Sequence, residues 1–88
     1  MRVEFLDKFL RDLDKLRDKS VKRNVKKVIE SVERASNFKS ISNTKRLSGH
    51  KSAYRVRVGD YRIGVFVEND LVEFARIAHR KDIYDIFP

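Results

Sequence analysis

A chain of 88 residues without cysteine has room for one thin hydrophobic core, and no disulfide framework or thiolate metal site supports it. The formal net charge is +8, which points to an anionic partner such as nucleic acid, an anionic membrane surface or an acidic protein. The apolar runs are short and the first residues lack the apolar segment of a signal peptide. We therefore expect one cytoplasmic domain over residues 1–88, with no membrane partner, no metal and no cofactor.

The first half of the chain predicts a strand and two helices. Residues 2–6 alternate, with Val3 and Phe5 inward, and Asp7 and Ser20 are the expected helix caps. Apolar residues at three- and four-residue spacing form one stripe on each helix: Leu6, Phe9, Leu10, Leu13 and Leu16, then Val21, Val25, Val28, Ile29 and Val32. The short connection predicts an antiparallel helical hairpin. The outer face of the second helix is basic (Lys22, Arg23, Lys26, Lys27 and Arg34) and is open to two interpretations, a binding patch or a solvated face.

The second half predicts a sheet. After a loop over 36–43, strands are expected at about 53–58, 61–68 and 71–79, with turns at Gly59-Asp60 and Asn69-Asp70. The facing of Arg76 depends on whether the last hairpin contains a bulge. The C-terminal residues 82–88 are expected to fold back onto the sheet as one apolar-faced turn. The predicted fold class is α+β with the order β-α-α-β-β-β, in which the helical hairpin packs on one face of an antiparallel sheet of about four strands. The other face is left open.

Three arginines share that open face. A two-residue turn pairs Arg57 with Arg62, and side-chain alternation places Arg55 beside them. Like charges directly opposite each other destabilise a sheet, so an anionic ligand explains the arrangement better than folding does. The surrounding stretch from Lys45 to Arg62 carries a net charge of +5. Its other cations, Lys45, Arg46 and Lys51, are expected to contact the same anionic ligand.

This order of elements, with the stretches YRVRVGDYRIGVF and AHRKDIYDIFP, resembles the RelE/ParE superfamily of toxins from type II toxin–antitoxin systems, and is closest to its RelE-like branch. The resemblance implies a metal-independent, ribosome-dependent endoribonuclease (an mRNA interferase) that cuts mRNA in the A site by attack of the 2′-hydroxyl on the adjacent phosphate, and so inhibits translation. It also implies a cognate antitoxin, acidic and partly disordered when free, that forms a hetero-oligomer with the toxin.

The resemblance also assigns roles to single residues, and the RNA substrate that it implies makes Lys45, Arg46 and Lys51 the expected RNA-binding residues. Arg55 and Arg57 fall where the family places basic catalytic residues, and Arg62 falls on its phosphate-binding arginine. Arg80 and Tyr84 match the arginine and tyrosine of the C-terminal motif, which assist proton transfer or charge stabilisation and stack on or orient a base. Some relatives have lysine at the first two positions, and an arginine is a poor base because its guanidinium group effectively stays protonated. His79 is a candidate for the missing base and, equally, for a packed strand-end residue.

Two other functions fit the same sequence. A ParE-like protein on the same fold would inhibit DNA gyrase by binding, without nuclease activity. A catalytically silent RNA-binding module is the third interpretation, because the general base is unassigned. The clustered arginines with Arg80 and Tyr84 favour the nuclease.

Overall fold

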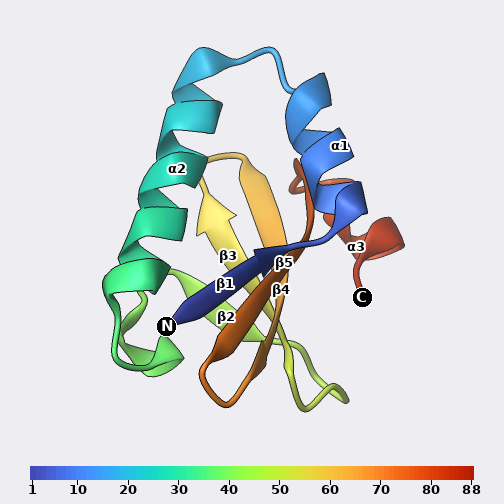
Figure 1. Cartoon of the computed structure of the whole chain (residues 1–88). Helices are drawn as coiled ribbons and strands as arrows, with labels where there is room; N and C mark the ends of the chain where they lie inside the picture. The colour runs from blue at the N-terminus through green and yellow to red at the C-terminus, as the bar shows by residue number, and fades with distance from the viewer.

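The computed structural model describes all residues, 1–88, and contains one five-stranded sheet between two layers of helix (Figure 1). The strands are β1 (Arg2–Phe5), β2 (Thr44–Arg46), β3 (Ala53–Val58), β4 (Tyr61–Glu68) and β5 (Leu71–His79), in the sheet order β1-β5-β4-β3-β2. The α+β class is confirmed. The prediction of about four antiparallel strands is corrected, because β1 pairs parallel with β5 and β2 adds an edge strand. With only three residues, β2 has too little alternation to be recognised.

Helices α1 (Asp7–Lys15) and α2 (Lys19–Arg34) cover one face of the sheet (Figure 1). Both predicted caps are wrong by one or two residues. The N–H of Leu6 donates to the carbonyl of Phe74 at 3.0 Å, so the ladder between β1 and β5 continues to Leu6 and Asp7 becomes the first helical residue. The carboxylate of Asp18 caps α2, since it accepts hydrogen bonds from the backbone N–H groups of Ser20 and Val21 at 2.9 and 3.3 Å.

The main core lies between these helices and the sheet. Its buried members come from both helices, from the short 3-10 helix η1 (Phe38–Ser40) and from the three long strands: Phe9, Val25, Val32, Phe38, Val56, Val58, Ile63, Val65, Val72, Phe74 and Ile77. The expected inward stripe of α1 is only partly buried, because Leu6 and Leu10 stay exposed, and so does Phe5 of β1. Helix α1 lies beside β5, where part of its inner surface makes polar contacts instead. None of the helices combines the length and the apolar character that crossing a membrane requires.

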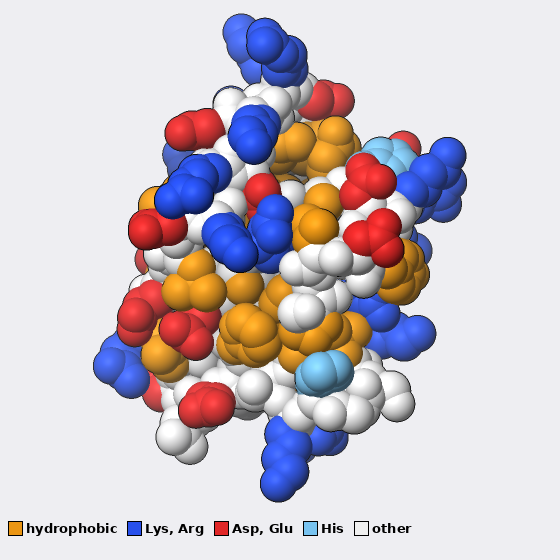
Figure 2. Space-filling view, turned by 90° about the vertical axis from the view of Figure 1, so that its right-hand side faces the viewer, with side chains coloured by type: hydrophobic (Ala, Val, Ile, Leu, Met, Phe, Trp, Pro, Cys, Tyr) orange, Lys and Arg blue, Asp and Glu red, His pale blue; other side chains and the backbone are white.

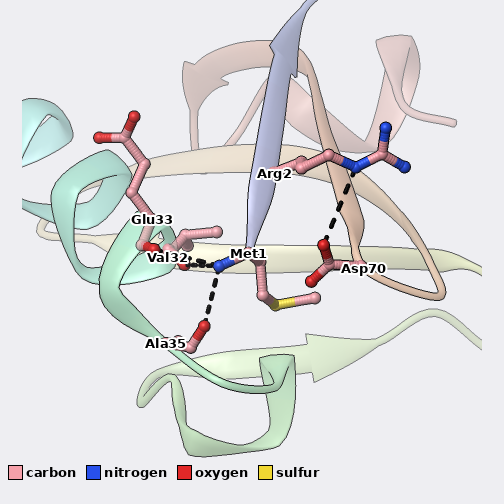
Figure 3. Close-up of polar contacts among 6 residues, drawn as sticks. All are labelled: Met1, Arg2, Val32, Glu33, Ala35 and Asp70. Atoms are coloured by element: carbon pink, nitrogen blue, oxygen red, sulfur yellow. Dashed lines mark hydrogen bonds and ion pairs between the residues drawn. The ribbon is translucent and has the colours of Figure 1, made fainter.

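The chain start is fixed by polar contacts (Figure 3). The amino group of Met1 donates to the carbonyls of Val32, Glu33 and Ala35 at 3.3, 3.1 and 2.8 Å. The last carbonyls of a helix have no partner within the helix, and a positive charge near them is favourable. Arg2 lies 3.8 Å from the carboxylate of Asp70 in the turn between β4 and β5. Strand β1 is therefore held between the end of α2 and this turn.

The prediction that the C-terminal residues fold back onto the sheet is confirmed, and for this reason the second face is partly covered and not open as predicted. Helix α3 (Ile83–Ile86) and the residue after it fold back onto this face and build a second small core from Leu47, Ala53, Ala75, Ile83 and Phe87. A Cβ atom on Gly64 would overlap the ring of Phe87. Gly64 therefore makes room for an aromatic ring of the chain itself, a role that sequence reasoning did not consider. The part of this face that α3 leaves free carries the arginines.

A β-bulge in β5 determines the side of the sheet from which the Arg76 side chain projects. Gly64 pairs with Arg76 and Val65 pairs with Phe74, so Ala75 is the extra residue on β5. The guanidinium of Arg76 then reaches Asp12 of α1 and donates to both of its carboxylate oxygens, at 2.7 and 3.1 Å. The hydrogen bond from Arg76 to Asp12 raises the pKa of Arg76 above its usual value. The backbone N–H of Ile77 also donates to Asp12 at 3.1 Å, so this one carboxylate joins α1 to β5.

Candidate phosphate-binding site

The hairpin of β3 and β4 has the register that the sequence predicted. Arg57 pairs with Arg62, Val58 pairs with Tyr61, and the turn between them has two residues. Gly59, the first of these, has a φ of 58°, a conformation that glycine adopts at little cost. Because side chains alternate along each strand, Arg55, Arg57 and Arg62 leave the sheet on the same side.

These arginines line a hollow of about 390 Å³ on the part of the sheet that α3 leaves free. We call it the arginine site, and it is lined by Asn43, Thr44, Lys45, Arg55, Arg57, Arg62 and Tyr84. Four of these side chains are cations and none is a carboxylate. A hollow with this lining is suited to an anion with several oxygen atoms, such as a phosphate group.

Arg62 is held in place by its own turn. Its Nη1 atom donates to the carbonyl of Gly59 at 2.8 Å and to the carbonyl of Tyr61 at 2.9 Å. These two bonds fix the guanidinium at the rim of the hollow, while its other N–H groups stay available. Arg62 thus has a structural role that sequence reasoning did not foresee, in addition to facing a ligand.

Arg55 lies against the aromatic ring of Tyr84. The central carbon of its guanidinium is 4.3 Å from the centroid of the ring, which is the geometry of a cation–π interaction. The Nε atom of Arg55 is buried and has no hydrogen-bond partner. Tyr84 is 68% exposed, because its neighbour Ile83 is the residue that anchors α3 in the second core. Tyr84 therefore presents most of its surface at the rim of the hollow.

Arg57 and Lys45 are the free cations of the site. Both are exposed, and neither side chain makes an ion pair or a hydrogen bond. The backbone N–H of Arg57 donates to the carbonyl of Asn43 at 2.9 Å, and Lys45 on β2 pairs with Arg55 on β3. The edge strand that the prediction missed therefore carries one of the predicted RNA-binding residues directly into the hollow.

Arg80 and His79 do not line the arginine site. The backbone N–H of Arg80 donates to the carbonyl of Asp60 at 2.7 Å, and its side chain reaches the Asp60 carboxylate only at 4.0 Å. His79 pairs with Tyr61, so it faces the helix-covered side of the sheet, where its ring meets that of Tyr61 edge to face at 5.7 Å. Its Nδ1 atom accepts a hydrogen bond from the N–H of Lys81.

The remaining predicted RNA-binding residues lie elsewhere. Arg46 and Lys51 line a separate hollow around the loop between β2 and β3. Conversely, sequence reasoning missed Asn43 and Thr44 as lining residues. The sequence contains only a weak signal for Asn43, because it stands in a loop rich in Ser and Asn. Its φ of 62°, which distinguishes it from its neighbours, is known only from the structure.

A different side of the molecule carries apolar side chains. Figure 2 shows hydrophobic side chains gathered on the side that α1 and α3 present, with charged side chains around them. Phe5, Leu6 and Leu10, at the end of β1 and in or next to α1, are exposed, and Leu6 also lines a hollow with Ile86 and Pro88. This patch shares no lining residue with the arginine site.

Comparison with known proteins identifies this fold as that of a small toxin of the type II toxin–antitoxin class. A family model described as the ParE toxin of the type II toxin–antitoxin system parDE matches residues 3–84. The chain belongs to this family, and the resemblance to the RelE/ParE superfamily is confirmed.

Relatives of the RelE type match over the whole chain. Toxin RelE3 of Methanocaldococcus jannaschii is 36% identical over 89 residues, which is 100% of both chains. A chain in the crystal structure of the RelB–RelE antitoxin–toxin complex from Methanococcus jannaschii superposes with a TM-score of 0.82 at 34% identity, covering 97% of this chain and 99% of that one. The RelE–RelB complex from Pyrococcus horikoshii OT3 contains a chain with a TM-score of 0.73 at 22% identity, covering 90% and 93%, which shows the shared fold alone.

Proposed function

We propose that this toxin is an endoribonuclease that cuts mRNA in the ribosomal A site. The arginine site carries this proposal, because it collects four cations and no carboxylate in one hollow beside an exposed aromatic ring. Single-stranded RNA is commonly recognised by phosphate contacts together with base stacking on an aromatic side chain. Arg55, Arg57 and Arg62 would hold the scissile phosphate, and the outer surface of Tyr84 would receive a base.

The proposed reaction is internal transesterification. The 2′-hydroxyl of one nucleotide attacks the adjacent phosphorus, the bond to the 5′-oxygen of the next nucleotide breaks, and a 2′,3′-cyclic phosphate results without a metal ion. The guanidinium groups would stabilise the negative charge that builds up on the phosphorane oxygens. The 2′-hydroxyl must lose a proton and the leaving oxygen must gain one.

Lys45 and Tyr84 are the lining residues that can exchange a proton, whereas guanidinium groups stay charged. His79 faces the other side of the sheet, so we propose Lys45 in place of His79 for proton exchange in the hollow. Replacing Lys45 with Arg keeps the charge and removes the exchangeable amine. If Lys45 exchanges a proton, the Lys45→Arg variant will lose nearly as much cleavage rate as Lys45→Gln. If Lys45 only supplies charge, Lys45→Arg will stay close to the wild type.

A cognate antitoxin is the second partner that we propose, since related toxins form the RelB–RelE antitoxin–toxin complexes described above. An acidic segment that is disordered when free would neutralise the exposed arginine site on binding. The apolar patch around Leu6 and Leu10 offers a further surface for a protein partner. Binding of the antitoxin would block access of RNA and switch the toxin off.

The decisive experiment is translation of a defined mRNA in vitro, followed by mapping of its ends on the ribosome. We expect cuts in the A site with the wild type and at least a tenfold loss of rate with Arg57→Gln, because a hydrogen bond to a charged group contributes about 1.5–3 kcal/mol. Arg11→Gln is the matched control, since Arg11 is an exposed cation of α1 outside the hollow. Intact mRNA together with blocked supercoiling by gyrase would support the ParE-like inhibitor instead.

A further inference from the structure

A second hollow adjoins the arginine site at the edge of the sheet. It has a volume of about 220 Å³ and lies between α2, the loop before β2 and the end of β3. Its polar lining consists of Lys27, Ser31, Ser40 and Ser42 together with Asn43 and Arg57, and the last two also line the arginine site. We call this second hollow the α2 groove. Since the two hollows share Asn43 and Arg57, a ligand can pass from one to the other around the edge strand β2.

The chemistry of the α2 groove continues that of the arginine site. No carboxylate lines it, and Lys27 makes no ion pair. Hydroxyl and amide groups lie around this cation. The hydroxyls of Ser31 and Ser40 already donate to backbone carbonyls, so they can accept from ribose hydroxyls. The hydroxyl of Ser42 and the amide of Asn43 can donate to phosphate. The apolar lining comes from three residues that are partly or fully buried, so no deep apolar pocket for a peptide side chain is present.

The first eleven residues of α2 add a second observation. Residues 19–29 contain five cations and no acidic residue, and none of these cations forms an ion pair. Positive charge in the first turn of a helix is unfavourable, because the helix dipole already places positive charge there, and Lys19 and Lys22 stand in that turn. Arg23 precedes Lys27 by one helical turn, so both lie on the same side of α2. Like charges four residues apart destabilise a helix, so helix stability does not explain this pair, whereas an anionic chain along the helix does.

We infer that a single-stranded RNA leaves the arginine site over Asn43 and Arg57 and continues along the α2 groove to Lys27 and Arg23. This inference rests on the proposed function, since the arginine site is taken to hold the scissile phosphate. A single strand can follow the turn around the sheet edge, whereas a duplex resists bending on this scale because its persistence length is about 50 nm. The α2 groove would then bind nucleotides on one side of the cleaved bond and contribute affinity, not chemistry.

The test is binding of 2′-O-methyl RNA, which has no attacking hydroxyl and cannot be cut. Affinities are measured over a range of salt concentrations for an oligonucleotide of about 4 nucleotides and one of about 16, the two ends of the usual range of footprints of single-strand sites. The test variant is Arg23→Gln/Lys27→Gln. The control is Arg11→Gln/Lys15→Gln, which removes the same charge from exposed positions of α1 outside both hollows.

For the longer RNA we expect the test variant to lower the salt-dependence slope by about 1.4, since each phosphate contact with a single strand contributes about 0.7. The shorter RNA and the control variant should show no change of this size. Circular dichroism checks that α2 remains folded. An unchanged slope for the longer RNA, or no binding of it by the wild type, would overturn the inference.

Two outcomes distinguish this inference from a protein-binding groove and from the proposed nuclease function. If the test variant loses affinity for an acidic peptide and keeps its affinity for RNA, the groove belongs to a protein partner and the inference fails. Cleavage on the ribosome is measured independently. If the wild type cleaves mRNA and the test variant has an unchanged salt-dependence slope, the path along α2 is refuted and the nuclease is not. If the test variant has a lowered slope but the wild type does not cleave mRNA, the nuclease is refuted and the path along α2 is retained.

Discussion

The guanidinium of Arg55 lies 4.3 Å from the ring centroid of Tyr84, and this contact joins the sheet to the C-terminal helix across the rim of the arginine site. Arg55 comes from β3, the first strand of the basic hairpin, and Tyr84 comes from α3. One surface of the ring is therefore occupied by the protein itself. The opposite surface is available to a ligand.

Removal of the ring tests this contact. We expect Tyr84→Ala to lower the free energy of unfolding by about 0.5–1 kcal/mol, the usual value of an exposed cation–π pair. RNA cleavage should fall about tenfold to a hundredfold, since stacking of a base on an aromatic side chain is worth about 1–3 kcal/mol. Tyr84→Phe keeps the ring and should retain most of the binding affinity. A Phe variant as impaired in RNA binding as the Ala variant would refute the stacking role.

Gly64 and Phe87 should be energetically coupled. In Gly64→Ala the new methyl group meets the ring of Phe87, so we expect a loss of stability of about 1–3 kcal/mol, as in other overpacked cores. Because Phe87 anchors α3, Tyr84 should shift as well and cleavage should weaken. A double-mutant cycle with Phe87→Leu, followed by urea denaturation, measures the coupling. Additive losses in this cycle would show that the two residues do not contact each other as described.

The ion pair between Asp12 and Arg76 should contribute to stability. Its side chains retain relative exposures of only 13% and 23%, so removal of Asp12 leaves a half-buried guanidinium without its partner. We expect Asp12→Ala to cost about 2–3 kcal/mol, less than the loss at a fully buried pair. Asp14→Ala is the control, because Asp14 is an exposed acid on the same helix that makes no ion pair.

A second variant checks the mechanism of that loss. Replacing both partners with apolar residues, as in Asp12→Leu/Arg76→Met, should recover part of the stability, since no charge then remains unpaired, but the N–H of Ile77 still loses its acceptor. Equal losses for Asp12→Ala and Asp14→Ala in thermal unfolding would mean that the pair contributes nothing beyond helix propensity.

The cap of α2 should make stability depend on pH. Hydrogen bonds from Ser20 and Val21 lower the pKa of Asp18 below its ordinary value of 3.8. A carboxyl group whose pKa is lower in the folded state stabilises the fold above its unfolded pKa. This stabilisation is lost as the pH falls through the lowered pKa. The contribution is therefore complete at neutral pH and disappears below about pH 4.

Asp18→Asn isolates this effect, because Asn caps a helix about as well as Asp and does not titrate. Urea midpoints measured from pH 7 downward should fall more steeply for the wild type than for Asp18→Asn as the pH passes below 4. Parallel curves for the two proteins would show that Asp18 does not carry the acid sensitivity.

Local patterns predicted the hairpin well and tertiary features poorly. The two-residue turn and strict alternation determined the partners of Arg57 and Arg62 without reference to the rest of the molecule. The facing of Arg76 and His79 depended on the bulge at Ala75, which reverses the side-chain alternation for the remainder of β5. Turn residues and alternation do not encode this bulge.

The candidate site was likewise predicted in part. Arg55, Arg57, Arg62, Lys45 and Tyr84 meet in the hollow, whereas Arg46, Lys51, His79 and Arg80 lie outside it. The residues that meet belong to paired strands or to α3. Helix α3 reaches the hollow only because Ile83 and Phe87 have a second core to enter, on the face that was expected to be bare. A contact of this kind depends on long-range packing, which sequence periodicity does not report.

The position of α3 also orders events during synthesis of the chain. A ribosome makes every cation of the arginine site before it adds Tyr84 and Phe87, the ring and the anchor that complete the hollow. The sheet can therefore form while the basic surface is still unfinished. A nascent toxin would acquire its complete site only after α3 has emerged from the ribosome and packed on the sheet.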